Sequence, residues 1–70
     1  MRTSIKLTSA GRFQVVTAHP WGEVTSTTYS YLAAALKNAR RALECGALVD
    51  VAPAIQWAHG PQVRAAGLSL

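Results

Sequence analysis

One segment limits the folds open to this chain more than any other, the run from Leu32 to Leu43. Its apolar residues recur at three- and four-residue spacing, and they are Leu32, Ala35, Leu36, Ala39, Ala42 and Leu43. This spacing gathers all six side chains on one face of an α-helix. A Thr or Ser between Thr27 and Ser30 can cap the start, and Gly46 can end the helix in a left-handed conformation. The sequence therefore predicts an amphipathic helix whose apolar face must be covered.

Strand patterns precede this helix. Residues 4–9 alternate polar and apolar types, and residues 12–19 are rich in the β-branched and aromatic types that favour strands. The short link between them contains Gly11, which favours an antiparallel hairpin. Residues 23–29 follow a proline and a glycine that can reverse the chain, so we predict a third strand there. The alternative is an irregular lead-in to the helix.

After the helix, residues 47–51 resume the alternation of a strand, and Pro53 interrupts it. Residues 54–58 offer a second short run in which Trp57 would share a buried face with an isoleucine. The prediction is an α+β fold: a small antiparallel sheet of three to five strands with one amphipathic helix packed on one face, in the order ββ(β)αββ. The domain would span residues 1–58, and residues 59–70 would form a tail that frays or lies across the sheet.

The length of 70 residues allows one domain, and a composition of 50% hydrophobic and 14% charged residues is typical of a globular chain. Cys45 is the only cysteine, and with His19 and His59 it shows none of the spacings of a zinc site. We therefore expect no disulfide, no metal and no cofactor. No export signal or apolar run long enough for a membrane span is present, so a cytoplasmic location is expected.

The charge balance is basic, with seven Lys and Arg against three Asp and Glu and a net charge of +4. The side of the predicted helix opposite its apolar face carries three cations, Lys37, Arg40 and Arg41. Their position has two interpretations. They can be a solvated face that also complements the helix dipole, or they can contact an acidic partner. If all three met phosphates of a duplex, the affinity would fall with a salt exponent of about −2.7, which is typical of weak, nonspecific binding.

Trp21 lies between Pro20 and Gly22 at a predicted turn. An aromatic side chain there either folds back as a lid on the core or stays exposed as an interface anchor. Catalytic residues are not evident, because Cys45 falls in the last turn of the helix and the acids lack the pairing that acid–base chemistry needs. The five glycines are dispersed and form no phosphate loop. We therefore expect a protein that is not an enzyme.

The stretch FQVVTAHPWGEVTSTTYSYLAAALKNARRALECGALVDVAPAIQW reads as a hairpin, an alanine-rich helix, a glycine and a strand. In this order and in its length the chain resembles small phage-encoded α+β inhibitor proteins of the anti-CRISPR type. The likeness is one of shape and composition, so no functional residue is carried over from that group. It implies a non-enzymatic inhibitor that occupies a surface of a host nucleoprotein complex.

The sequence thus predicts a binding module whose contact residues are Lys37, Arg40, Arg41 and Trp21. Its partner would be a protein or nucleoprotein complex with an acidic surface. We expect no binding to a membrane. The alternative is a weak, nonspecific nucleic-acid-binding protein that uses the same cations. A second alternative is a homodimer in which an exposed sheet edge pairs with its twin.

Overall fold

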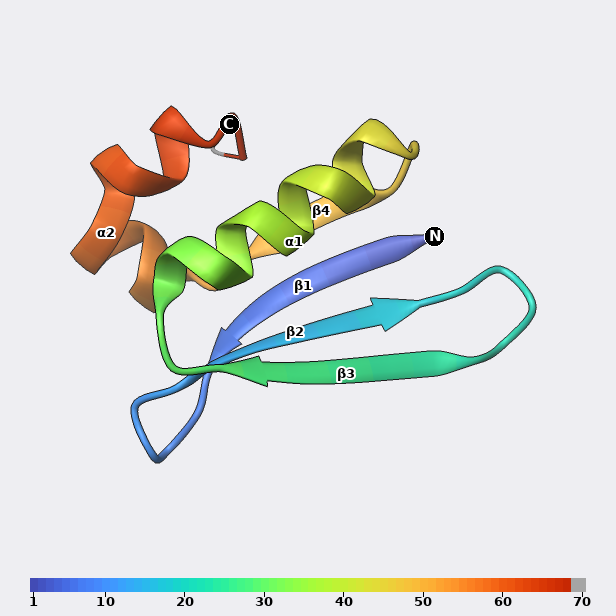
Figure 1. The fold of residues 1–70 in the computed structure, drawn as a ribbon, viewed down its shortest axis with the longest axis horizontal. Coiled ribbons are helices and arrows are strands. Elements are labelled where there is room, and N and C mark those ends of the chain that lie inside the picture. The colour runs from blue at the N-terminus through green and yellow to red at the C-terminus, as the bar shows by residue number, and fades with distance from the viewer. Residues whose placement is uncertain (69–70) are drawn as a thin grey trace.

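The computed structural model describes residues 1–68 and shows a four-stranded mixed sheet with two helices (Figure 1). The elements, in chain order, are β1 (Arg2–Leu7), β2 (Phe13–Ala18), β3 (Val24–Tyr29), α1 (Leu32–Glu44), β4 (Leu48–Val51) and α2 (Pro53–Ala65). The strands lie in the order β3-β2-β1-β4. The predicted α+β class, with an amphipathic helix packed on a small sheet, is confirmed.

The first three strands form an antiparallel meander. β1 pairs with β2 and β2 with β3, so the predicted hairpin and the predicted third strand are both confirmed. Ile5 faces Val15 across the first pair, and Val15 faces Thr27 across the second. Because side chains alternate between the faces of a sheet, these three residues share the face on which α1 packs. The opposite face carries polar residues such as Lys6 and Gln14.

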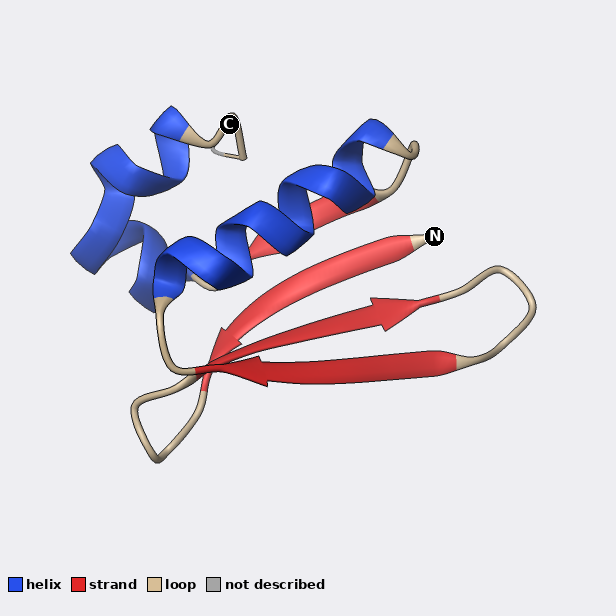
Figure 2. Ribbon diagram, in the orientation of Figure 1, coloured by secondary structure: helices blue, strands red, loops and turns tan. Residues whose placement is uncertain are grey.

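The last strand corrects the prediction of a wholly antiparallel sheet. β4 runs parallel to β1, with Arg2 beside Leu48 and Ile5 beside Val51. The cause is α1, which carries the chain from the end of β3 back along the sheet to the end where β1 begins. A strand that starts there must run in the same direction as β1. Figure 2 shows α1 running from the loop after β3 back to the end of the sheet where β1 and β4 begin.

α1 forms over the predicted apolar residues, and four of them are buried: Leu32, Ala35, Leu36 and Ala39. Gly46 follows its end with a φ of 94°, the left-handed conformation predicted for it. The prediction of a Thr or Ser cap is wrong. Tyr31 occupies the N-cap position, and no side chain donates or accepts a capping hydrogen bond there. The helix is therefore held by packing on the sheet rather than by a polar cap.

The predicted strand at residues 54–58 is wrong, because this segment opens α2. Pro53 occupies the first turn of the helix, where its missing N–H and fixed φ are favourable. Residues two apart point to different sides of a helix, so Ile55 is 1% exposed whereas Trp57 is 93% exposed. The prediction that Trp57 belongs to the core is therefore also wrong. α2 bends at His59, two residues before Pro61.

The core lies between the sheet and both helices. Its buried members are Ile5, Val15, Leu32, Ala35, Leu36, Ala39, Val51, Ile55, Val63 and Leu68. Val63 is 0% and Leu68 is 8% exposed, although both lie in the segment predicted as a tail. The predicted boundary at residue 58 thus falls inside α2, and residues 59–68 contribute to the core. Residues 69 and 70 of the predicted tail lie outside the described residues.

Candidate functional site

A hollow of about 300 Å³ lies between α1 and the edge strand β3. It is lined by Tyr29, Ala34, Lys37, Asn38 and Arg41, and we call it the α1–β3 groove. Four of these residues come from α1 at spacings of three and four, so they form one flank of the helix. Ala34 is small and leaves space at the start of the groove. The groove is therefore a product of helix spacing and of the strand that lies beside the helix.

β3 supplies the other wall of the groove. Tyr29 ends the strand and packs against the core with its ring half-buried. Thr25 and Thr27 project from the same face of β3 as Tyr29, because residues two apart in a strand share a face. Both threonines are exposed, and β3 is an edge strand of the sheet. Tyr29 is the residue of β3 that lines the groove, and the two exposed threonines lie farther back along the strand.

A hydrogen bond ties the two walls together. The Asn38 amide Nδ2 donates to the Tyr29 hydroxyl oxygen at 2.9 Å. A tyrosine hydroxyl that accepts one hydrogen bond still has its own proton to donate, and the Asn38 amide has a second N–H. These two residues therefore offer uncharged donors to a ligand in the α1–β3 groove, and they do so from a fixed position.

The cations of the groove are free. Lys37 and Arg41 are exposed, and in the described part of the chain neither side chain forms an ion pair or a hydrogen bond. Two of the three acids are engaged with other arginines, Asp50 with Arg2 at 3.0 Å and Glu44 with Arg40 at 3.2 Å. The charges of Lys37 and Arg41 are therefore available to an acidic ligand.

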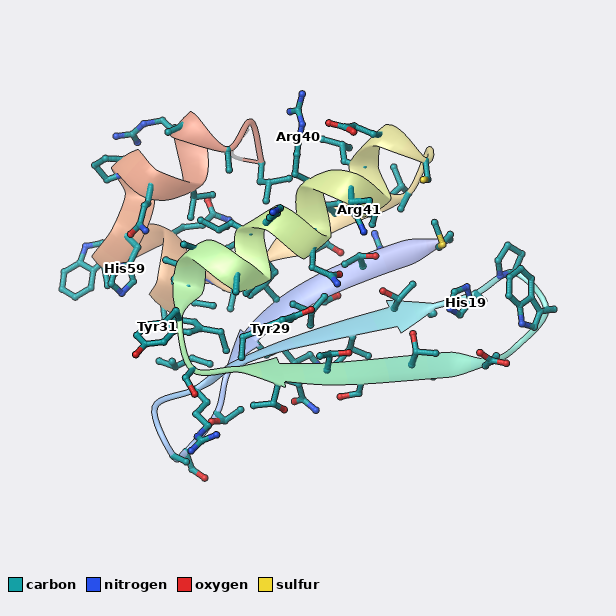
Figure 3. The ribbon with its side chains drawn as sticks, in the orientation of Figure 1. His19, Tyr29, Tyr31, Arg40, Arg41 and His59 are labelled. Atoms are coloured by element: carbon teal, nitrogen blue, oxygen red, sulfur yellow. The ribbon has the colours of Figure 1, made fainter. Side chains whose placement is uncertain are left out.

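Arg40 belongs to a different surface. Its Nε donates to Glu44 and its terminal nitrogen donates to the Ala66 carbonyl oxygen at 3.4 Å, just beyond α2. Figure 3 shows Arg40 and Arg41 leaving opposite sides of α1. Arg40 borders a second hollow, of about 350 Å³, between α1 and α2, and Lys37 lies on the crest between the two hollows. The structure thus brings Lys37 and Arg41 together and sets Arg40 apart.

Trp21 is 71% exposed at the turn between β2 and β3, so the interface-anchor alternative matches its exposure and the lid alternative does not. Its indole stacks on the imidazole of His19, with ring centroids 4.6 Å apart and an angle of 18° between the planes. The Nε2 atom of His19 lies 3.4 Å from the Thr25 hydroxyl. This turn is at the end of the sheet toward which α1 runs, and His19 lies beside it (Figure 3).

Sequence reasoning missed Tyr29, Asn38 and His19 as parts of this site. The position of Asn38, one turn after Ala34 and three residues before Arg41, was available from helix spacing. The contact of Asn38 with Tyr29 was not, since it depends on how α1 is placed over the sheet. The sequence suggested His19 as a metal ligand or as the base of a cysteine nucleophile, whereas in the structure its ring stacks on Trp21.

Within residues 1–68, no three His, Cys, Asp or Glu side chains lie close enough together to hold a metal ion. None of the described helices has the length and apolar character needed to cross a membrane. Cys45 is an exposed thiol at the end of α1.

The chain matches no protein-family model, no curated protein and no solved structure. What the α1–β3 groove binds must therefore follow from its geometry and its charge.

Proposed function

We propose that the protein is a non-enzymatic binding module that takes an acidic partner in the α1–β3 groove. One observation carries this proposal: two unpaired cations, Lys37 and Arg41, border a hollow that also presents the amide of Asn38 and the hydroxyl of Tyr29. Carboxylates and phosphates accept several hydrogen bonds, and they are bound most strongly where charged and neutral donors converge.

The resemblance to phage-encoded inhibitors suggests a biological form for this binding. In that form the protein would occupy an acidic surface of a host nucleoprotein complex and act by stoichiometric binding. The α1–β3 groove supports the binding step of this role, with Lys37 and Arg41 as its contacts. Binding to nucleic acid uses the same groove, and it would involve two phosphate contacts from α1 rather than three, because Arg40 is engaged elsewhere.

The test is a titration with two labelled anionic probes, a twelve-residue glutamate peptide and a twelve-nucleotide oligothymidylate, followed by fluorescence anisotropy at 50 and 200 mM salt. The Lys37→Glu/Arg41→Glu variant should bind both probes at least about tenfold more weakly. The matched control is Lys6→Glu/Arg64→Glu, which makes the same change in net charge away from the groove and should retain most of the affinity. If both double variants lose binding equally, the loss reflects net charge rather than the groove, and the proposal fails.

A second candidate function, a homodimer, is favoured by the outer edge of β3. In residues 1–68 no strand pairs with this edge, and the strand has six residues with no charge and no proline. Such an edge can pair with another strand. Sedimentation over a concentration range should then show the mass doubling, and Thr28→Lys should restore the monomer. A constant monomer mass at all concentrations contradicts this candidate.

A further inference from the structure

We propose that the ligand of the α1–β3 groove is a single-stranded nucleic acid, with its phosphates on Lys37 and Arg41 and one base stacked on Trp21. This inference rests on the proposed function and names the chemical class of its partner. It joins two features that the sequence keeps apart, a pair of cations on a helix and an exposed indole at a turn.

The topology aligns these features along one path. β3 runs from the turn that carries Trp21 to the start of α1, and α1 then runs back toward the end of the sheet where that turn lies (Figure 1). Arg41, in the last turns of α1, is therefore nearer to Trp21 than Lys37 is. The six residues of β3 span roughly 20 Å. A path of this length can hold several nucleotides of an extended strand.

The surface along this path suits a sugar–phosphate backbone. Thr25, Thr27 and Tyr29 offer hydroxyl groups on one side, and Lys37 and Arg41 offer positive charge on the other. Glu44, the acidic residue of α1, does not line the groove and is paired with Arg40. Glu23, immediately before β3, places a carboxylate at the Trp21 end of the path.

The indole of Trp21 is held in position and has one face available for stacking. His19 covers one face of the indole, and a side chain that is 71% exposed leaves the other face available. Because the ring is already held by His19, less conformational freedom is lost when a base stacks on it. Trp57 is a natural comparison: it is 93% exposed, but it belongs to α2 and makes no aromatic stack in the described structure.

This combination distinguishes a single strand from the other acidic partners. A basic groove combined with an exposed aromatic ring farther along the same surface suits a single strand, whose unpaired bases have free faces. The bases of a duplex are stacked on one another and cannot reach Trp21. A carboxylate-rich peptide would use Lys37 and Arg41 but would have no flat ring for the indole.

The experiment compares three labelled probes by fluorescence anisotropy: the twelve-nucleotide oligothymidylate, a twelve-base-pair duplex and the twelve-residue glutamate peptide. We expect the single strand to bind most tightly. Two phosphate contacts with a single strand predict a salt exponent of about −1.4, so the affinity should fall about sevenfold between 50 and 200 mM salt. The Lys37→Glu variant should reduce the magnitude of this exponent by about 0.7, because one phosphate contact is lost.

Matched tryptophan variants test the stacking. Trp21→Ala should weaken binding of the oligothymidylate about tenfold, whereas Trp57→Ala should leave it unchanged. In a Trp57→Phe background Trp21 is the only tryptophan, and its fluorescence should be quenched by the oligonucleotide. In the reciprocal Trp21→Phe background the signal from Trp57 should not change. Circular dichroism checks that each variant is folded, and Trp21→Leu provides a second ring-free variant if Trp21→Ala is not.

The outcomes separate this inference from the proposed function. If the glutamate peptide or the duplex binds as tightly as the single strand, the inference is wrong and the binding module remains. The inference is also wrong if the Trp21→Ala and Trp57→Ala variants bind the oligothymidylate with equal affinity. If no anionic probe binds at 50 mM salt, both proposals fail. A further sign in favour would be tighter oligonucleotide binding by Glu23→Gln, because that variant removes the carboxylate at the end of the path.

Discussion

The two flanks of α1 carry the same kind of residue and differ in what lies beside them. On the flank toward β3, Lys37 and Arg41 border an open groove and make no ion pair in the described structure. On the flank toward α2, Arg40 is held between Glu44 and the carbonyl oxygen of Ala66. The first flank has cations available to a ligand, and the second uses its cation to join two helices.

The difference arises from the neighbouring element. α2 ends beside α1, and the carbonyl groups at a helix end lack partners within the helix, so an arginine that donates to one is favourable. β3 is an edge strand, and nothing in residues 1–68 packs outside it. The cations on that side therefore have no structural partner. A basic residue on a helix is thus a candidate contact only where the adjacent element leaves it free.

The largest effect should come from the core beneath the α2 flank. Val63→Asp places a carboxylate at a position that is 0% exposed, at a cost of several kcal/mol, which should unfold a domain of this size. The control is Gln62→Asp, because the neighbouring side chain is exposed. Urea denaturation followed by circular dichroism measures both. A stable Val63→Asp protein would mean that residues 59–68 are peripheral, as the sequence suggested.

The β3 flank should give the opposite result. Lys37→Glu/Arg41→Glu should weaken oligothymidylate binding by at least about tenfold at 50 mM salt and leave the free energy of unfolding within roughly 0.5 kcal/mol of the original. The reason is that both side chains are exposed and unpaired. Anisotropy and urea denaturation on the same samples measure the two quantities. A large loss of stability would show that this flank also has a structural role.

A smaller effect is expected where the chain passes Arg40 after α2. Gly67 has a φ of 74°, and a Cβ there would meet the guanidinium group of Arg40. Gly67→Ala should therefore lower the free energy of unfolding by about 1 to 2 kcal/mol. In an Arg40→Ala background the steric part of this loss should disappear. Additive losses in this double-mutant cycle would mean that Gly67 and Arg40 do not interact.

The smallest effect should come from Arg40→Ala alone. Its ion pair with Glu44 is exposed and its bond to Ala66 is long, so we expect a loss of at most about 1 kcal/mol in stability. Oligothymidylate binding should fall by less than about twofold, since Arg40 does not line the α1–β3 groove. Thermal unfolding and anisotropy measure these changes. A loss of affinity as large as that of Arg41→Ala would remove the distinction between the flanks.

The sequence by itself determined the elements whose signal is local. The helix followed from the spacing between Leu32 and Leu43, and its end followed from Gly46, because both depend only on neighbours along the chain. The hairpin of β1 and β2 followed from alternation and a short glycine-containing link. The exposure of Lys37 and Arg41 also followed, since they lie opposite the apolar face of the helix.

Only the tertiary structure decided the rest. The short run after Pro53 fits a strand or a helix, and burial of Ile55 and Val63 against the core makes it a helix. The direction of β4 depends on where α1 ends over the sheet. The division of the cations depends on which element lies on each flank of α1. Periodicity places a side chain on a face of its own element, but only packing between elements determines what that side chain meets.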